Sequence, residues 1–251
     1  NGRIQVFDFR TGEFKRTFGT PGFGFVPGDL LFVNGVSVIN DLVYASSALH
    51  QIVVFDKEGN EVDRIGEFGF GPGQFFFPFD VQCDHFGNFY VTDNFNNRVQ
   101  KFDPDFNFVQ IIGEGLLVAP SRIYVDSRNR IFVTDTGNNM VRVFKGSTGE
   151  LLSSFGGFGL GEGSFFLPFG ITMDRLERFV IVTESGTNRI STFKNRHGFP
   201  FSDTFSQLGA TDTDIFFPSA AVQCGGINQV CVSNNALSTV KRFRLNLNKR
   251  R

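Results

Sequence analysis

Residues 69–113 have the sequence GFGPGQFFFPFDVQCDHFGNFYVTDNFNNRVQKFDPDFNFVQIIG. This stretch contains four short apolar segments, which are Phe79–Cys83, Phe89–Thr92, Arg98–Phe102 and Phe108–Ile112. The breaks DHFGN, DNFNN and DPDFN between them have turn-forming compositions. The segment RVQKF alternates apolar and polar residues as a half-buried strand does, and no part of the chain has helical periodicity. The stretch therefore predicts four short antiparallel strands.

The third of these segments recurs along the whole chain. Each copy ends on a phenylalanine that follows a β-branched residue by three positions. The phenylalanines are Phe7, Phe55, Phe102, Phe144, Phe193 and Phe243, at spacings of 48, 47, 42, 49 and 50 residues. A repeat of about 40–50 residues with four strands is typical of a β-propeller blade. We expect these six phenylalanines to be buried between blades.

The repeat resembles the NHL repeat. In residues 67–113 the resemblance rests on Gly71-Pro72-Gly73-Gln74-Phe75, Pro78, Asp84, Gly87-Asn88, Val91-Thr92-Asp93, Asn97-Arg98 and Phe102-Asp103. Much of the motif returns in residues 121–156 and 161–193, for example as Val133-Thr134-Asp135 and as Asn188-Arg189. The resemblance implies an all-β fold, a six-bladed β-propeller of four-stranded antiparallel blades. Such repeats occur in tripartite-motif ubiquitin ligases, in Brat-related translational repressors and in scaffold proteins.

The strand count places the chain out of phase with whole blades. Residues 1–19 hold a third and a fourth strand, and residues 207–251 hold a first, a second and a third. The expected repeats are 1–19 (a partial first blade) and five full ones, 20–66, 67–113, 114–156, 157–206 and 207–251. We expect one domain over residues 1–251, a fragment of a longer protein. A blade shared by both ends, with Phe14–Phe18 as its fourth strand, would remove an exposed edge.

The polar residues of the motif are interpreted as architecture. Asp93 is expected to accept hydrogen bonds from the backbone of the loop that follows it. Arg98 is expected to tie that loop to a neighbouring blade. The glycines of the Gly-x-Gly-Pro-Gly link supply turns with positive φ. We expect the same structural role for Asp135, Glu184 and Arg189.

The sequence contains no pattern that indicates catalysis or a bound cofactor. The glycine runs at 69–73 and 157–163 precede strands, whereas a dinucleotide loop opens a helix. His50, His85 and His197 fall in loops expected on different faces, too far apart to share a metal ion. No nucleophile has a plausible neighbouring base. We therefore expect a protein that is not an enzyme and binds no metal or cofactor.

Composition narrows the class of protein further. Lys+Arg 24 against Asp+Glu 25 gives a net charge of −1, which argues against a protein held mainly by phosphate contacts. No run of 18 apolar residues is present, so no membrane insertion is expected.

Of Cys83, Cys224 and Cys231, the last two are candidates for one disulfide bridge, but free core thiols are favoured. We expect a cytoplasmic location, with an extracellular one left open.

Phenylalanine is unusually abundant, with 35 residues against no tryptophan and three tyrosines. Many of these phenylalanines fall in apparent loops, namely Phe23, Phe25, Phe70, Phe86, Phe95, Phe106, Phe158 and Phe199. Clusters of exposed aromatic residues mark protein interfaces. We take Phe70, Phe86, Phe95 and Phe158 as candidate partner-binding residues of a scaffold that binds a protein or another copy of itself.

Single-stranded RNA binding is the alternative function. The resemblance implies it, because relatives in the Brat-like branch bind single-stranded RNA on one face of the disc and act in post-transcriptional regulation. That mode needs basic and aromatic residues on one surface. The candidates are Arg98, Arg122 and Arg189. Neighbouring acidic residues offset the positive charge of these arginines, so we rank protein binding ahead of RNA binding.

Overall fold

The computed structural model describes residues 2–8, 10–23, 26–206, 218–224, 229–234 and 239–244. The chain divides into two compact units, Asn1–Gly115 (unit 1) and Leu116–Arg251 (unit 2). In the described residues every regular element is a strand, apart from two three-residue 3-10 helices, η1 (Asn94–Asn96) and η2 (Thr136–Asn138). The expected all-β class is confirmed.

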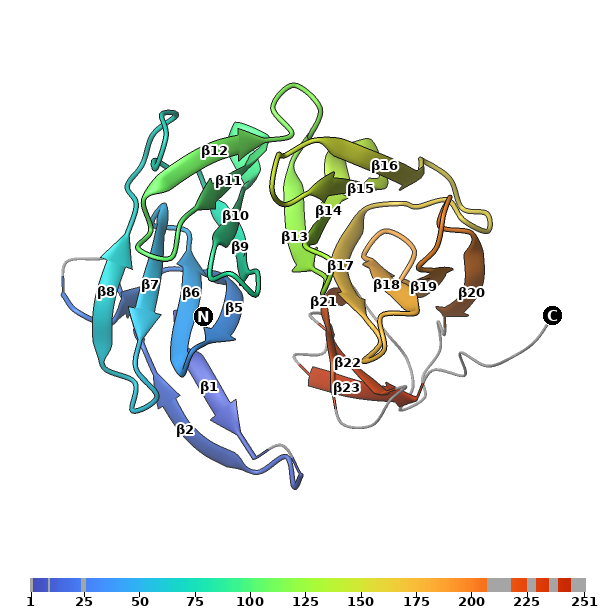
Figure 1. Cartoon of the computed structure of the whole chain (residues 1–251). Coiled ribbons are helices and arrows are strands. Elements are labelled where there is room, and N and C mark those ends of the chain that lie inside the picture. Colours follow the sequence, from blue (N-terminus) through green and yellow to red (C-terminus); the bar gives the residue numbers. More distant parts are fainter. Residues whose placement is uncertain are drawn as a thin grey trace. The chain divides into compact units, whose positions relative to one another are not determined.

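Unit 1 contains two four-stranded antiparallel sheets (Figure 1). The first consists of β5 (Val33–Ile39), β6 (Leu42–Ser47), β7 (Gln51–Phe55) and β8 (Glu61–Ile65). The second consists of β9 (Pro78–Cys83), β10 (Phe89–Asp93), β11 (Arg98–Phe102) and β12 (Phe108–Ile112). A hairpin of β1 (Ile4–Phe7) and β2 (Phe14–Phe18) precedes them, followed by the short parallel pair β3 (Thr20–Pro21) and β4 (Asp29–Leu30).

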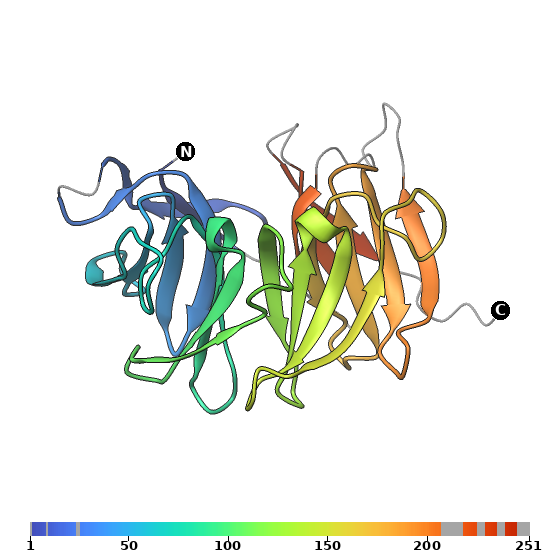
Figure 2. The ribbon, with the colours of Figure 1, turned by 90° about the horizontal axis from the view of Figure 1, so that it is seen from above.

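Unit 2 repeats the same sheet pattern, and Figure 2 gives a second view of it. One sheet consists of β13 (Pro120–Val125), β14 (Arg130–Asp135), β15 (Met140–Lys145) and β16 (Leu151–Gly156). The next consists of β17 (Pro168–Met173), β18 (Phe179–Glu184), β19 (Arg189–Lys194) and β20 (Phe201–Ser206). The last described sheet has three strands, β21 (Pro218–Gln223), β22 (Gln229–Asn234) and β23 (Thr239–Arg244).

The described strands have the phase that the sequence predicts. β1 and β2 form a two-stranded sheet in the positions of a third and a fourth strand, and β21, β22 and β23 form a sheet of three. The four complete sheets between them are four-stranded blades, as expected. Completion of one blade by the two ends, and the joining of all repeats in one domain, stay predictions.

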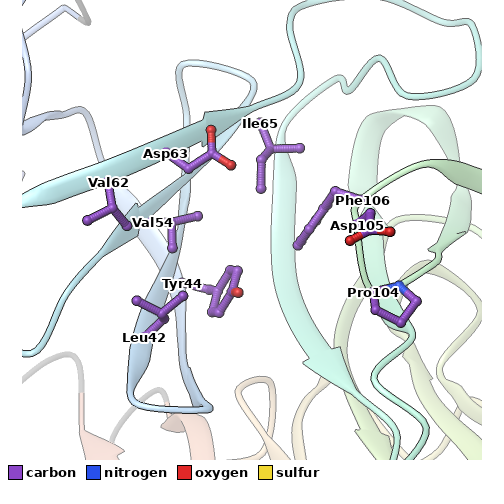
Figure 3. A pocket seen from close by; sticks show the side chains of 9 residues that line it. All are labelled: Leu42, Tyr44, Val54, Val62, Asp63, Ile65, Pro104, Asp105 and Phe106. Atoms are coloured by element: carbon purple, nitrogen blue, oxygen red, sulfur yellow. The ribbon is translucent and has the colours of Figure 1, made fainter.

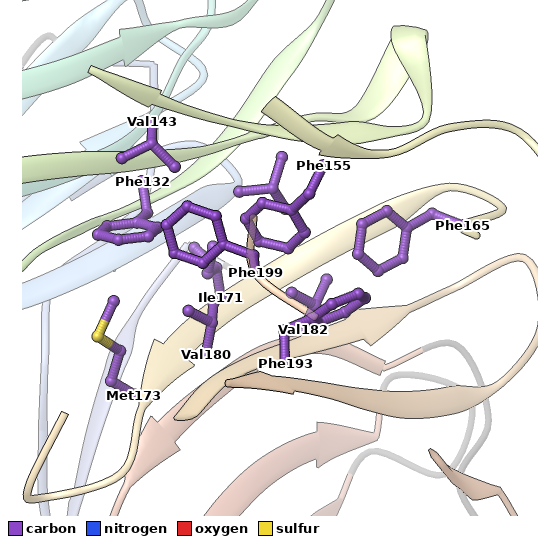
Figure 4. Close-up of a cluster of buried hydrophobic side chains, with 11 residues drawn as sticks. Phe132, Val143, Phe155, Phe165, Ile171, Met173, Val180, Val182, Phe193 and Phe199 are labelled. Carbon is purple, nitrogen blue, oxygen red and sulfur yellow. The ribbon is translucent and has the colours of Figure 1, made fainter. Parts of the chain in front are cut away.

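Four of the recurring phenylalanines are core residues. Phe55, Phe102, Phe144 and Phe193 are at most 2% exposed. In unit 2, Phe193 packs with Phe155, Phe165 and Phe199 in a cluster that spans two sheets (Figure 4). The expectation is wrong for Phe7, which is 52% exposed, because it lies in a two-stranded hairpin, where its ring packs edge-to-face on Phe14. The side chain of Phe243 lies outside the described part of the chain.

Two phenylalanines expected in exposed loops are instead anchors between sheets. Phe106 and Phe199 occupy third-to-fourth-strand turns with φ of 60° and 42°. Phe106 stacks on Tyr44 of the preceding sheet, and Phe199 stacks on Phe155. A positive φ is strained for a bulky side chain and persists only where the surroundings compensate it. The apolar packing of both rings supplies that compensation.

Two cysteines are paired rather than free. Cys224, which follows β21, and Cys231 in β22 form a disulfide across a hairpin, with 5.8 Å between their Cα atoms. The preference for free thiols at these positions is therefore wrong, because the β21–β22 hairpin pairs Val222 with Cys231 and Gln223 with Val230 and so brings the next residue, Cys224, close to Cys231. Cys83 is a free, half-buried thiol.

The role of Phe199 is testable in unfolding experiments. Replacing Phe199 by Ala deletes a ring that is only 6% exposed, and we expect a loss of about 3 kcal/mol of unfolding free energy. Phe158→Ala in the same unit is the matched control, since that ring is 73% exposed and its loss should cost less than about 0.5 kcal/mol. Urea titration followed by circular dichroism measures both. Equal effects of the two substitutions would contradict the anchoring role.

Candidate protein-binding site

A buried ion pair fixes the connector between β8 and β9. Asp93, the last residue of β10, is fully buried, and its Oδ2 accepts a hydrogen bond from Nε of Arg98 at 2.8 Å. The guanidinium also donates to three connector carbonyls, those of Phe70, Gly71 and Gln74, at 2.7–3.0 Å. Asp93 Oδ1 accepts from the backbone N–H of Phe76 at 2.7 Å. The pair thereby holds residues 66–77 against the sheet.

The same device recurs in unit 2. Glu184 at the end of β18 pairs with Arg189 at 2.7 Å, and Arg189 donates to the carbonyls of the next connector, at Leu160, Gly161 and Ser164. The repeat between them departs from the motif, because Met140 replaces the arginine. Arg142, two residues later, supplies the guanidinium to Asp135 at 2.6 Å. Residues two apart on a strand point to the same face, so the ion pair is retained.

The arginines proposed for RNA binding are engaged with protein. Arg98 and Arg189 are 4% and 8% exposed, and their guanidinium groups point to carbonyls and carboxylates. Arg122 is half-buried, and its Nε lies 3.4 Å from the Ser219 carbonyl oxygen. This placement agrees with the architectural role. One detail was wrong: Asp93 accepts a backbone hydrogen bond from the connector before β9, not from the loop after β10.

The outer surface of the β8–β9 connector carries a group of aromatic side chains. We name this group the aromatic patch, and its members are His50, Phe68, Phe70, Phe76, Phe77 and Phe95. Neighbouring ring centroids lie 4.9–6.0 Å apart, mostly in tilted or edge-to-face pairs. Phe68, Phe70 and Phe95 are 53%, 67% and 54% exposed. Contiguous exposed rings of this kind are characteristic of interaction surfaces.

The four candidate phenylalanines do not form one site. The aromatic patch unites Phe70 and Phe95, since both contact the ring of Phe76. Phe86 is 63% exposed but lies in the β9–β10 turn at the opposite end of the sheet, beside His85. Phe158 belongs to unit 2, where it contacts Phe166.

Sequence reasoning missed four members of the aromatic patch. They are His50, Phe68, Phe76 and Phe77. Phe68 and Phe70 alternate with glycine in the connector, and Phe76 and Phe77 extend the run of three phenylalanines that begins at Phe75. Phe75 itself is fully buried. A signal was therefore present in the alternation around the glycines, but the sequence alone did not separate buried from exposed members.

His50, which comes from the other sheet of unit 1, is hydrogen-bonded to the backbone of the aromatic patch. It lies in the β6–β7 turn, and its Nδ1 accepts the backbone N–H of Phe77 at 3.0 Å. Burial lowers the pKa of His50 below its ordinary value, and the Asp93 carboxylate opposes part of this change. The imidazole is therefore neutral at pH 7, as an acceptor at Nδ1 must be.

A cleft of about 320 Å³ opens elsewhere in unit 1. Figure 3 shows side chains of the β5–β8 sheet on one side of it and those of the β11–β12 turn on the other. Its charged groups are the carboxylates of Asp63 and Asp105. Burial raises the pKa of Tyr44, and the neighbouring Cys83 and Asp63 act in the same direction, so the phenol stays protonated at neutral pH. These groups do not form a nucleophile with a base.

The described ranges contain neither a candidate metal-binding cluster nor a candidate membrane-spanning helix. No group of three or more His, Cys, Asp or Glu is placed there to hold a metal ion. No helix in that part of the chain is long and apolar enough to cross a membrane.

Comparison with protein families agrees with the blades and their motif. A family described as a 6-bladed beta-propeller matches residues 29–114, and the NHL repeat matches residues 117–144. The NHL repeat thus matches one stretch of unit 2, and the propeller family matches most of unit 1. Protein brain tumor of Drosophila melanogaster is 30% identical over 138 residues, 53% of this chain and 13% of that protein. NHL repeat-containing protein 3 of Homo sapiens is 26% identical over 155 residues, 57% of this chain and 44% of that protein. The chain spans less than half of either relative.

Solved structures share the fold of this chain. A catalytically inactive virginiamycin B lyase from Staphylococcus aureus, crystallised with quinupristin, aligns with a TM-score of 0.63 at 16% identity. The alignment covers 98% of this chain and 78% of the lyase. At this identity the likeness concerns the fold alone.

The structural role of Arg98 can be measured directly. Arg98→Ala leaves the buried Asp93 carboxylate without its partner, and we expect a loss of about 3–5 kcal/mol of unfolding free energy. Arg16→Ala removes an exposed arginine of the same unit and should change stability by less than about 0.5 kcal/mol. Urea titration compares the two variants with the wild type. Wild-type stability of Arg98→Ala would show that the guanidinium does not hold the connector.

His50 should make unit 1 less stable in mild acid. Its pKa is lowered in the folded state, so the unfolded chain binds its proton first, at about pH 6.5. Stability is then fully present above that pH and declines as the pH falls toward the folded pKa. The substitution His50→Asn keeps a hydrogen-bond acceptor at this position and does not titrate. Asparagine also tolerates the positive φ of 65°. We expect a smaller drop in melting temperature between pH 7 and pH 5 for His50→Asn. An equal drop in both proteins would exclude the linkage.

Proposed function

We propose that the chain is a non-catalytic binding scaffold in which NHL-type blades mediate protein–protein interaction or assembly. The observation that carries this proposal is the aromatic patch. Three of its rings are more than half exposed, while hydrogen bonds with Arg98 and Asp93 hold the backbone of its connector in place. The partner is another protein or a second copy of the chain.

The energetics of the patch favour a protein partner. Burying one phenylalanine side chain contributes up to about 1.5–3 kcal/mol, and a few central aromatic residues dominate most interfaces. The connector is already ordered by Arg98 and Asp93. A partner that docks on it therefore loses little free energy to the ordering of this segment.

Catalysis is not part of the proposal. The cleft of unit 1 is lined by two carboxylates and a protonated phenol, and its lining contains no histidine, lysine, serine or cysteine. The lyase that shares the fold does so at 16% identity, and function is carried by particular side chains rather than by a fold.

RNA binding is the weaker candidate for this chain. Arg98 and Arg189 would have to leave buried ion pairs before they met a phosphate. The loss of such a pair costs about 3–5 kcal/mol. Salt distinguishes the candidates, since phosphate-driven binding weakens steeply with ionic strength whereas an aromatic interface does not.

The disulfide bears on the compartment in which the scaffold works. Disulfides persist in secreted and other oxidising compartments and are rare in the cytosol. The pairing of Cys224 with Cys231 therefore favours an oxidising compartment over the cytoplasmic location expected from sequence.

The patch is tested by substitution of its two most exposed rings. Phe70→Ser combined with Phe95→Ser removes apolar contacts without touching the carbonyl through which Arg98 holds the connector. We expect association, with itself or with a purified partner, to weaken by about 2 kcal/mol or more, roughly 30-fold. Sedimentation velocity over a range of concentrations measures self-association. Isothermal titration measures a partner first found by cross-linking and then purified.

Phe86→Ser is the matched control, since Phe86 is as exposed as Phe70 but lies at the other end of the same sheet. It should leave association unchanged. If Phe86→Ser abolishes association and the double variant does not, the aromatic patch is not the interface. If neither association nor partner binding occurs and a U-rich RNA oligomer binds in a salt-sensitive manner, the scaffold proposal is overturned.

A further inference from the structure

Unit 2 has a cleft lined by four cationic side chains and one carboxylate. Its volume is about 430 Å³, and its lining is Arg128, Leu176, Glu177, Arg178, Phe179, Lys194, Asn195 and Arg196. These residues come from the β13–β14, β17–β18 and β19–β20 turns and the strand ends beside them. We name this feature the basic cleft. It brings together residues up to 68 positions apart, Arg128 and Arg196, which sequence reasoning did not connect.

The framework of the basic cleft is rigid. Asn195 links two of the turns, since its Nδ2 donates to the Glu177 carbonyl at 2.7 Å and its N–H donates to the Arg178 carbonyl at 2.7 Å. Its Oδ1 accepts from Arg130 at 2.7 Å. A further bond closes the β19–β20 turn, from the N–H of the buried Phe199 to the Arg196 carbonyl. The cationic side chains thus project from fixed backbone positions.

The acidic residues near the basic cleft are already engaged. The Glu177 carboxylate accepts from the backbone N–H of Ser127 at 2.9 Å and from its hydroxyl. Glu177 also faces Tyr124, whose pKa is raised to about 12 by burial and then by the nearby carboxylates. Asp174 is 1% exposed and pairs with Arg178 at 3.0 Å. Neither carboxylate forms an ion pair with Arg128, Lys194 or Arg196 among the described residues, and the four cations of the lining outnumber its one carboxylate.

Three cationic side chains of the basic cleft take part in none of the ion pairs found among the described residues. The ion pairs of unit 2, within the described residues, use Arg130, Arg142, Arg178 and Arg189. Arg128, Lys194 and Arg196 are exposed and are not among them. Three like charges around one cleft repel each other, so an anion with more than one oxygen stabilises the arrangement.

We propose that the basic cleft binds a side chain of a partner protein that carries a phosphate or sulfate ester, with Arg128, Lys194 and Arg196 as its contacts. Arginine matches the oxygens of such groups with two parallel hydrogen bonds, and arginine clusters are a recurring means of recognising modified side chains. The proposal rests on the protein-binding function proposed above but uses a different surface. Phosphoserine and sulfotyrosine are two sources of the same tetrahedral oxyanion.

Single-stranded RNA fits the basic cleft less well. Its recognition relies on aromatic rings on which bases stack. The one aromatic ring that lines the cleft within the described residues, Phe179, is 9% exposed and lies beneath the Arg178 guanidinium. Leu176, which is 57% exposed, offers an apolar contact of a size suited to one side chain.

The test uses fluorescence polarisation with three labelled peptides of otherwise equal sequence. One carries phosphoserine, one carries sulfotyrosine, and one is unmodified. We expect the whole chain to bind at least one modified peptide about tenfold or more tightly than the unmodified peptide. The preference between the two modified peptides identifies the source of the oxyanion.

Matched variants assign the binding to the cleft. Arg128→Ala with Arg196→Ala should weaken binding of the modified peptide about tenfold or more. Arg16→Ala with Lys57→Ala removes the same net charge from exposed sites of unit 1 and should change binding less than about twofold. Circular dichroism and melting temperature confirm that each variant is folded.

Three outcomes overturn the proposal. They are equal binding of modified and unmodified peptides, equal loss in the cleft and control variants, and binding of a U-rich RNA oligomer through the cleft without binding of either modified peptide. Phe70→Ser with Phe95→Ser should leave binding of the modified peptide intact. Failure at the aromatic patch is thereby distinguishable from failure at the basic cleft.

Discussion

The buried pairing of a carboxylate with an arginine is the interaction on which three of the repeats depend, as Asp93–Arg98, Asp135–Arg142 and Glu184–Arg189. It joins the end of a second strand to a third strand and, through the guanidinium, to the connector that leads into the same sheet. A charged pair in a core is favourable only if its remaining donors and acceptors are satisfied. Here the connector carbonyls and the N–H of Phe76 satisfy them. This pair and the fully buried ring of Phe75 hold the connector in place, so its outer side chains are available for binding.

This division between a fixed backbone and free side chains explains why the two proposed surfaces differ in chemistry. On the β8–β9 connector the outward side chains are phenylalanines, and the surface is apolar. At the turns of unit 2 they are arginine and lysine, held by Asn195 and by the closed turn around Arg196. Loops on a rigid scaffold carry recognition because their side chains vary without altering the packing beneath.

The sequence predicts the strands well, because alternation and turn composition are local properties. It also predicts that Asp93 and Arg98 are architectural. It does not predict which of many similar side chains are exposed, since that depends on the neighbouring sheet. Phe106 and Phe70 both occur among turn residues, yet the first stacks on Tyr44 and the second faces solvent. The cations of the basic cleft were missed for the same reason: three separate turns supply them, and no local pattern marks which turns meet.

The turn that ends in Phe199 has a consequence for how recognition can evolve. Phe199 is buried in the core, where its ring packs on Phe155. Its backbone N–H donates to the Arg196 carbonyl and closes the turn. The side chains of Lys194 and Arg196, by contrast, are exposed. Point mutations at Lys194 or Arg196 can therefore change the ligand while the fold keeps its stability. Selection on binding and selection on folding act on separate positions of a single turn, and a new specificity requires no compensating change in the core.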